Sequence, residues 1–330
     1  MLGSFIWPVW ARPQTATRLV FRSRNACAGA AVSDCAVALL SIGLLVAAAM
    51  PVDHDDRADR ATASQTRADA AAMGANERAF GFYLGAPKHD PSDFHLEKPG
   101  ATNLTIKNIE WYARPFQHPI YYGARWLRWG DSGQFGTMID FTHSKAYSFE
   151  PVDQGQAATD PEKTFEGTIN GKPAPAKAKV SDYFDKLEWT HGHNMLTYNG
   201  LMRLMRFGPF QTYAGAGGGI SLPHSEIHLK TDASRTYEYQ YTGPSAQALA
   251  GIEWRLPVGS IFFEYKFTSA IYWGPLTGRN GTWLPADLWS QITRWLSGEP
   301  PRDGWAGAIL NSHQGIGGFM VRFQAKPAGS

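Results

Sequence analysis

The fold is decided by one stretch near the end of the chain, Ile261–Trp273, which reads IFFEYKFTSAIYW. Large apolar side chains recur in it with a period of two, and the residues between them include Glu264, Lys266 and Thr268. Successive side chains of a β-strand point to opposite faces, so this alternation predicts a strand with one apolar and one polar face. We expect the apolar face to contact lipid. Its members are Ile261, Phe263, Tyr265, Phe267, Ile271 and Trp273.

Outward from this strand, the chain shows eight segments rich in Tyr, Trp, Phe, Gly and Thr, joined alternately by short turns and long connections. The turns are Gly130–Gly133, Phe207–Pro209 and Pro257–Gly259. This alternation predicts an all-β fold: an eight-stranded antiparallel up-and-down transmembrane β-barrel with short periplasmic turns and long extracellular loops. A soluble sandwich is the alternative. The expected strands are 79–86, 120–129, 135–148, 193–205, 210–224, 236–256 (with a bulge at Gly243–Pro244), 260–273 and 312–323, and the long loops are 87–119, 149–192, 225–235 and 274–311.

The N-terminal region has the pattern of an export signal. Basic residues precede an apolar run, Cys35–Met50, that ends in small side chains, which predicts a signal peptide or N-terminal apolar leader over 1–50. An uncleaved helix anchor is the alternative interpretation. We expect a disordered linker over 51–78, the barrel over 79–323 and a polar tail over 324–330, with the exported protein in the outer membrane of a Gram-negative bacterium.

Composition excludes several classes of protein. Both cysteines, Cys27 and Cys35, lie in the leader, so a disulfide scaffold or a cysteine-based zinc module is excluded from the remainder. The formal charge of +2 comes from the leader, which carries a net +3. The remaining chain has no basic excess of the kind that nucleic-acid binding requires. No second apolar run is long enough for a spanning helix, which excludes an α-helical polytopic membrane protein.

Charged residues on the polar parity of the strands are expected inside the barrel. An eight-stranded barrel is too narrow for an open pore and is filled by side chains. We therefore predict a packed ion-pair network and place function at the extracellular rim. The interior set is Arg125, Asp140, Arg203, Glu253, Arg255, Glu264, Lys266 and Arg322.

Histidines gather where the strands meet the long loops, and three interpretations stay open. They are ordinary loop residues, or His224 and Glu226 are a general base and its partner, since the two lie on one strand face. Alternatively, His191, His193, His224 and His228 bind a divalent metal, because His-x-His places two ligands on one strand face. Lys145, Lys266 and Arg125 suit lipid phosphates, although the last two also suit the interior network.

Seven motifs, in order along the chain, resemble the outer-membrane lipid A oxidases of Gram-negative bacteria. The resemblance runs from about residue 79 to 323, without much of the last long loop. The motifs are Pro119–Arg125, Ile139–Lys145, Leu196–Asn199, Tyr213–Gly219, Pro223–Glu226, Tyr237–Gln240 with Gly243–Pro244, and Glu264–Lys266.

The resemblance implies oxidation of the proximal glucosamine of lipid A to 2-aminogluconate, with molecular oxygen as co-substrate and peroxide as co-product. It implies lipid A or lipopolysaccharide of the outer leaflet and the barrel-assembly machinery as partners. The cofactor is unknown, and a divalent metal stays an open alternative. By position, the catalytic candidates are His224, Glu226 and His143, and the substrate-binding candidates are Lys145, Arg125, Lys266 and Glu264.

Two departures from the family pattern bear on whether the chain is an active member. The family has an acidic residue at the position of His191 and an apolar one at that of His193, so this chain could be an altered or inactive relative. It could also be a non-catalytic barrel for adhesion or envelope integrity, or a lipid A acyl hydrolase or transferase. A hydrolase needs a serine beside His224, but Ser225 points to the opposite strand face. Residues 285–296 form an expected amphipathic helix, which lies in the membrane interface or caps the barrel mouth.

Overall fold

The computed structural model describes residues 74–100, 102–149, 159–232, 235–299 and 303–324, which all lie in one compact unit. The predicted leader, most of the predicted linker and the tail from 325 onward lie outside the described residues. The first strand begins at Glu77, two residues before its predicted start. Within the described part of the chain, no helix combines the length and the apolar character needed to cross a bilayer.

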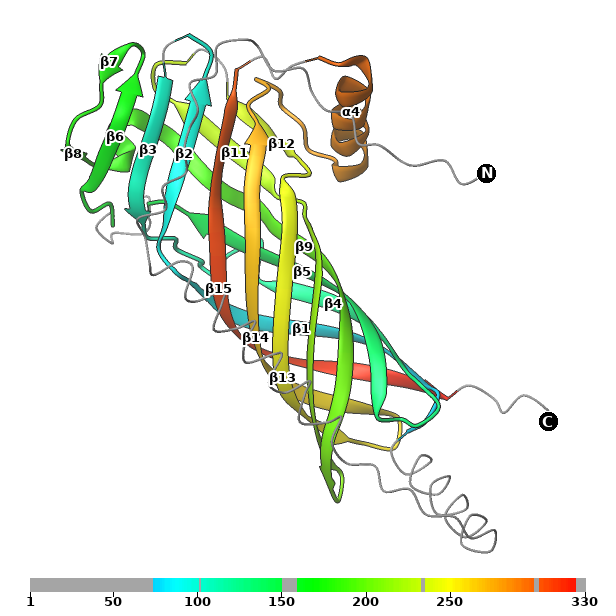
Figure 1. Ribbon diagram of the computed structural model, residues 1–330. Helices are drawn as coiled ribbons and strands as arrows, with labels where there is room; N and C mark the ends of the chain where they lie inside the picture. Colours follow the sequence, from blue (N-terminus) through cyan, green and yellow to red (C-terminus); the bar gives the residue numbers. More distant parts are fainter. Residues whose placement is uncertain (1–73, 101, 150–158, 233–234, 300–302, 325–330) are drawn as a thin grey trace, which may run out of the picture. The chain divides into compact units, whose positions relative to one another are not determined.

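Eight antiparallel strands close into a barrel, as predicted (Figure 1). Each strand pairs with its neighbour in the sequence of barrel strands, and β1 pairs with β15 along its whole length. Closure leaves no sheet edge facing lipid, where an unpaired backbone group would cost several kcal/mol. The barrel strands are β1 (Glu77–His89), β4 (Tyr122–Trp129), β5 (Phe135–Tyr147), β9 (Phe184–Phe207), β10 (Phe210–Ser221), β13 (Gly243–Arg255), β14 (Gly259–Pro275) and β15 (Trp305–Gln324).

The wall of the barrel has the predicted two faces. On β14, Glu264 and Lys266 are buried inside, whereas Phe263 and Tyr265 lie outside with more than half of their surface exposed. A closed barrel with an aromatic and aliphatic exterior and a polar interior is the structure that spans an outer membrane. The protein therefore has the structure of a transmembrane β-barrel of the outer-membrane type. Further exposed apolar side chains around the wall are Phe82, Leu84, Trp126, Ile139, Tyr198, Trp254, Ile309 and Phe319.

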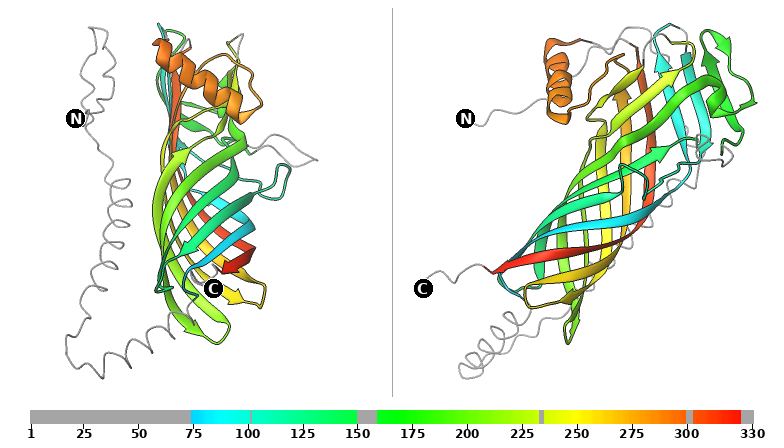
Figure 2. Two further views of the ribbon diagram at one scale, coloured as in Figure 1. Left: turned by 90° about the vertical axis from the view of Figure 1, so that its right-hand side faces the viewer. Right: turned by 180° about the vertical axis from the view of Figure 1, so that it is seen from behind.

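The long connections are more regular than the sequence analysis expected, because several form strands that extend the sheet beyond the barrel (Figure 2). Phe94, Leu96, Leu104 and Ile106 alternate with polar residues and pack into an apolar core. That burial stabilises strands in regions predicted to be loops. The extending elements are β2 (Ser92–Lys98), β3 (Thr102–Ile109), β6 (Lys163–Ile169), β7 (Lys172–Pro173), β8 (Lys177–Ala178) and the short α3 (Val180–Tyr183).

A second extension lies beside the upper part of β9. There β11 (His224–Leu229) pairs with β9 on one side and with β12 (Thr236–Tyr239) on the other. The predicted single strand 236–256 is therefore two strands, β12 and β13. The expected bulge at Gly243–Pro244 is wrong, because Gly243 takes a φ of 151° and begins β13 instead. The predicted amphipathic helix is confirmed as α4 (Leu284–Ser297).

Candidate functional site

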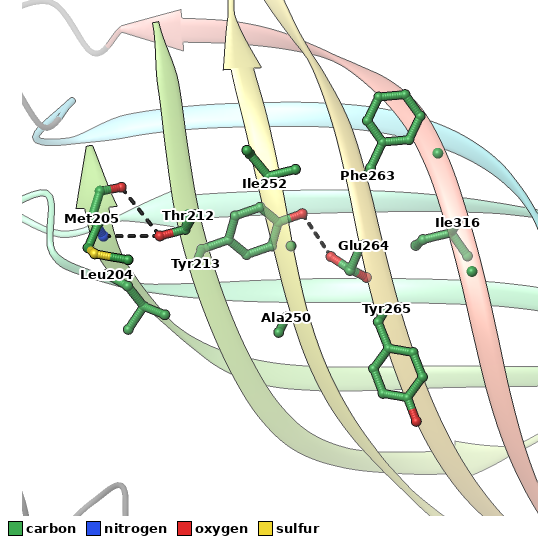
Figure 3. Close-up of a pocket in the computed structure, with 13 residues that line it drawn as sticks. Leu204, Met205, Thr212, Tyr213, Ala250, Ile252, Phe263, Glu264, Tyr265 and Ile316 are labelled. Atoms are coloured by element: carbon green, nitrogen blue, oxygen red, sulfur yellow. Dashed lines mark hydrogen bonds between the residues drawn. The ribbon is translucent and has the colours of Figure 1, made fainter. Parts of the chain in front are cut away.

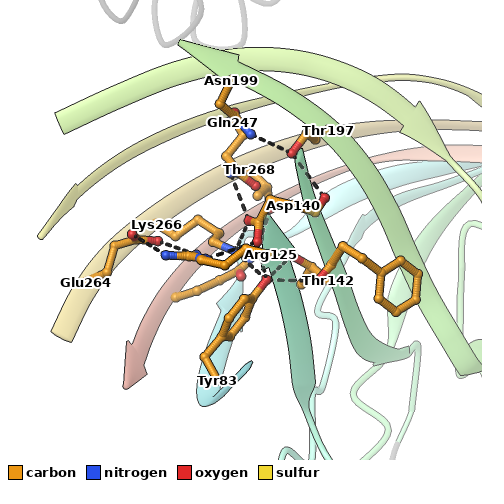
Figure 4. A network of polar contacts seen from close by, with 12 residues as sticks. Tyr83, Arg125, Asp140, Thr142, Thr197, Asn199, Gln247, Glu264, Lys266 and Thr268 are labelled. Carbon is orange, nitrogen blue, oxygen red and sulfur yellow. Dashed lines mark hydrogen bonds and ion pairs between the residues drawn. The ribbon is translucent and has the colours of Figure 1, made fainter. Parts of the chain in front are cut away.

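The middle of the barrel is filled by buried ion pairs, as predicted (Figure 4). Arg125 donates two hydrogen bonds to Glu264, at 2.8 and 3.0 Å, and the Lys266 ammonium lies 2.6 Å from Asp140. All four side chains are fully buried. Each of these charged side chains is paired with another inside the barrel. Together the paired side chains fill the lumen. Of the predicted substrate-binding residues, Arg125, Glu264 and Lys266 thus take part in the interior network and lie outside the candidate site.

A second interior network closes the end of the barrel that carries the short turns. Its centre is Glu77, which pairs with Arg203 at 2.8 Å and also with Arg255 and Arg322. Sequence reasoning missed Glu77 because the first strand was expected to begin two residues later. The signal that could have found it is the alternation of the strand. Phe80 and Phe82 take the outward positions, so Glu77 shares the inward positions with Ala79 and Gly81.

A shallow depression of about 850 Å³ crosses the outer wall over β9, β10, β13, β14 and β15 (Figure 3). Small residues such as Ala250 and Gly251 lie between larger side chains, including Phe263 and Tyr265. The carboxylate reached there, Glu264, already accepts a hydrogen bond from Tyr213 at 2.8 Å and two from Arg125. The depression thus offers apolar contact with lipid and no free chemical group.

The candidate site lies at the opposite end, on the extension formed by β9, β11 and β12. Its residues, here called the rim cluster, are His143, Lys145, Glu188, His191, His224, Glu226, Tyr237 and Tyr239. Alternation along β11 sends Ile227 and Leu229 into the apolar core and places His224 and Glu226 on the other face. Glu226 lies opposite Glu188 of β9 in the strand register. The cluster therefore lies on the face of the sheet opposite the apolar core, although His143, Lys145, Glu188, His224 and Glu226 are themselves buried.

His224 is held in one tautomer. Its Nε2 lies 3.0 Å from the carbonyl oxygen of Gly281, and a carbonyl can only accept a hydrogen bond. The proton is thus on Nε2, and Nδ1 carries the lone pair. Nδ1 is buried and has no hydrogen-bond partner among the described residues. Burial lowers the pKa of His224 to about 4, so the imidazole is neutral at physiological pH.

Aromatic rings surround His224. Tyr237 and Tyr239 meet it edge to face, with ring centroids at 4.3 and 4.6 Å, and the ring of His191 lies 5.0 Å away. The Tyr237 hydroxyl is 3.3 Å from Nε2 of His191. These rings exclude water from one side of the imidazole and fix its plane.

Two carboxylates lie beside the histidines, but neither holds His224. Glu226 accepts a hydrogen bond from Arg235 at 3.0 Å, and Glu188 accepts from Lys186 at 3.2 Å and from Thr190 at 3.0 Å. Burial, assisted by the neighbouring charge of Glu226, raises the pKa of Glu188. The prediction that Glu226 orients His224 is therefore corrected, because the carbonyl of Gly281 makes that contact.

His143 shares the outward parity of Ile139, as predicted, but it is covered. Its ring stacks on Tyr122 at 4.6 Å, and Nδ1 is 2.8 Å from the side-chain oxygen of Asn194. Nε2 is buried without a partner in the described residues. Lys145, two residues further along β5, donates its hydrogen bond to the carbonyl of Gln117 at 2.9 Å. Burial lowers the pKa of His191, another member of the cluster, and the positive charge of Lys145 contributes to this shift.

The predicted four-histidine metal set is not brought together. Gly192, with a φ of 144°, separates His191 from His193, and His193 turns inward to contact Tyr272 in the apolar core. His228 lies further along β11 and pairs with Asp185 at 3.4 Å. Across the described ranges, no three His, Cys, Asp or Glu side chains are placed to share a metal ion. The His-x-His expectation failed because β9 bulges around Gly192, which has a positive φ, so that His191 is exposed whereas His193 is buried.

No family model matches the chain, and no curated protein matches it. Several solved structures align with it. The outer membrane protein OprG from Pseudomonas aeruginosa covers 76% of this chain and 98% of its own, with 11% identity and a TM-score of 0.40. Ail, the attachment invasion locus protein of Yersinia pestis, solved with the heparin analogue sucrose octasulfate, covers 76% and 99%, with 10% identity and a TM-score of 0.29. The outer membrane protein AlkL in DMPC bilayers covers 78% and 94%, with 12% identity and a TM-score of 0.35.

Proposed function

We propose that the protein is an outer-membrane enzyme that oxidises the proximal glucosamine of lipid A to 2-aminogluconate with molecular oxygen. One observation carries the proposal: a neutral imidazole, His224, has its tautomer fixed by Gly281 and its Nδ1 left without a partner among the described residues, on the face of the extension opposite the apolar core. A group of this kind is ready to accept a proton. Its position suits a substrate that approaches from the outer leaflet.

Cations around His224 suit the phosphates of lipid A. Lys145 has a carbonyl as its hydrogen-bond partner in the described part of the chain, so its ammonium keeps capacity for an anion. Arg235 and Lys186 lie on the same side and are partly exposed. Charge-assisted hydrogen bonds to phosphate are among the stronger polar contacts in proteins. We therefore assign Lys145 to substrate binding and the two exposed cations to attraction of the head group.

The proposed reaction begins at the anomeric hydroxyl of the sugar. Nδ1 of His224 takes the hydroxyl proton, the C1–H bond breaks, and a C1=O bond forms, which gives a lactone. Two electrons and two protons pass to molecular oxygen, giving hydrogen peroxide. Water then opens the lactone to the 2-aminogluconate. In this proposal the described side chains supply the proton transfer and the anion contacts.

The resemblance to lipid A oxidases supports the reaction class. The chain departs from the family pattern at His191, and two nearby carboxylates bear on that difference. The family carries an acid where this chain has His191. Here Glu188 and Glu226 lie opposite each other on β9 and β11. Burial lowers the pKa of His191, and the negative charge of Glu188 partly offsets this by raising it. We propose that this pair supplies the acidic character of the site. His143, with its unpartnered Nε2 among the described residues, is assigned to contact the sugar.

The test uses a Gram-negative host that lacks this modification and whose lipid A carries a free anomeric hydroxyl on the proximal glucosamine, because a phosphate there would block the proposed step. Lipid A extracted with and without expression of the full chain is compared by mass spectrometry. A gain of one oxygen atom on the proximal sugar supports the proposal. Unchanged lipid A, with the barrel folded in the outer membrane, contradicts it and leaves the non-catalytic barrel. Loss of an acyl chain also contradicts it and indicates a hydrolase.

A further inference from the structure

The helix α4 is amphipathic with its polar side toward the protein. The side chains of Asp287 and Gln291 are buried against β12 and the residues that follow it, although they are polar. The opposite side of the helix carries Trp289, Ile292 and Leu296, which are all exposed, Leu296 by 82%. In a helix that packs onto a water-soluble domain, the apolar stripe faces the core and the polar one faces solvent. In α4 this arrangement is reversed.

The polar side of α4 attaches the helix to the rest of the protein by hydrogen bonds. Backbone N–H groups of Tyr239 and Tyr241 donate to Asp287 at 3.1 Å and to Gln291 at 2.8 Å, and Gln291 donates back to the Tyr241 carbonyl at 2.9 Å. Arg294 reaches Glu238 at 3.3 Å. The helix thus satisfies backbone groups at the edge of β12. This docking fixes which side of α4 is turned outward.

The outward side lies at the level where the lipid-facing wall ends. Tyr241 is held by Gln291, and the next carbonyl, that of Thr242, accepts a hydrogen bond from the backbone of Trp273 at 2.9 Å. Trp273 is the last large outward residue of β14, and it stacks on Trp305 with centroids 6.3 Å apart. Indole rings favour the head-group level of a bilayer. Figure 1 shows α4 beside β12 at this end of the barrel.

We propose that α4 lies in the interface of the outer leaflet, with Trp289, Ile292 and Leu296 inserted among the lipid acyl chains. The occupant of this apolar face is the membrane that already surrounds the wall, because the face continues the exposed apolar surface past Trp273. Interfacial helices bind through such a combination of Trp and aliphatic side chains. The inference rests on the barrel alone and does not depend on the proposed reaction.

The position of α4 in the membrane interface determines how deep the rim cluster lies relative to the lipid head groups. Gly281, two residues before Trp283 and three before the start of α4, bonds to His224 through its carbonyl. An interfacial α4 therefore places His224 beside the lipid head groups. Trp283 and Trp295, both exposed, flank the apolar stripe and add to the indoles at this level.

The test measures the depth of α4 in vesicles. The full chain with Cys27→Ser and Cys35→Ser is reconstituted in phosphatidylcholine vesicles, and a nitroxide label is attached at Leu296→Cys or, separately, at Ile292→Cys. Phe263→Cys on the wall is the lipid reference, and Lys172→Cys on β7 is the aqueous reference. Spin-label relaxation by oxygen, which concentrates in lipid, is compared with relaxation by a water-soluble nickel chelate.

We expect the ratio of oxygen to nickel accessibility at 292 and 296 to be severalfold above that at 172 and close to that at 263. A ratio at both positions equal to that of 172 overturns the proposal, because the helix then faces water. Shielding of both labels from both reagents also overturns it, since that result indicates coverage by protein. Two labelled positions keep the test valid if one substitution disturbs the helix.

Discussion

The Nε2 atom of His224 donates a hydrogen bond to the carbonyl oxygen of Gly281 over 3.0 Å, and these two residues lie 57 positions apart in the sequence. A backbone carbonyl therefore takes the orienting role that a carboxylate often plays for a catalytic histidine. It stabilises one neutral tautomer and leaves Nδ1 as the acceptor. The reactivity expected of the rim cluster follows from this contact.

His224→Gln should abolish most of the lipid A oxidation while the barrel still folds. Glutamine keeps a donor for the Gly281 carbonyl but cannot accept the sugar proton, and loss of a general base costs about 100-fold or more in rate. His228→Gln is the matched control, because it lies on the same strand and pairs with Asp185 outside the rim cluster. Product formation is followed by mass spectrometry of lipid A. Equal losses in the two variants would argue against a specific role for His224.

The rate should change little as the pH falls from about 7 to about 5.5. Burial lowers the pKa of His224 to about 4, so its Nδ1 remains unprotonated over this range. A histidine with the ordinary pKa of about 6.5 would lose roughly eightfold of its neutral form. The check is the initial rate of peroxide release at saturating lipid A. A fall of that size with a midpoint near pH 6.5 would mean that the base is a solvated histidine.

Asp140→Ala should strongly destabilise the barrel. The substitution leaves Arg125 and Lys266 buried with only Glu264 to balance them, and an uncompensated buried charge costs about 3–5 kcal/mol. The free energy of unfolding is measured in denaturant on the refolded protein. Lys107→Met is the control, since its pair with Asp93 is about one-third exposed and contributes no more than about 1 kcal/mol. Similar losses in both variants would contradict a tightly packed interior network.

The protein should not conduct ions in a planar bilayer. Arg125, Asp140 and Lys266 meet across the lumen with no exposed surface, and eight strands leave no room for a water-filled channel. Stable single-channel currents from the purified wild-type protein would contradict this expectation. Asp140→Ala provides a comparison, because it removes one of the side chains that fill the lumen.

The barrel could be predicted from the sequence because a membrane imposes simple rules on it. A strand in the wall must place an apolar side chain toward lipid at every second position, and the stretch Ile261 to Trp273 shows this alternation in its sequence. The extension was missed although Phe94, Leu96, Leu104 and Ile106 show the same period, because the charged residues beside them are also typical of solvated loops. These strands bury their apolar side against each other rather than against lipid.

The candidate site was predictable in residue type and in location, but not in its contacts. His143 and His224 were found because histidines gather at one end of the strands. The partner of His224 was not, since the carbonyl of Gly281 reaches it only through the docking of α4 on β12. The bulge around Gly192 likewise separated His191 from His193, which a regular strand would have placed on one face. Contacts that depend on backbone geometry across long connections leave no pattern in residue type.

The oxidation is tested most sharply by the reaction in air of the purified full-length protein with lipid A that carries a free anomeric hydroxyl, in water enriched in oxygen-18. We expect a product heavier by one labelled oxygen atom on the proximal sugar, with one peroxide released per product. Neither should form without oxygen, and with His224→Gln both should form at least about 100-fold more slowly. Water opens the lactone, so the oxygen atom that the sugar gains should be oxygen-18 from the water. Unmodified lipid A after prolonged incubation with the folded protein would show that the protein is not a lipid A oxidase.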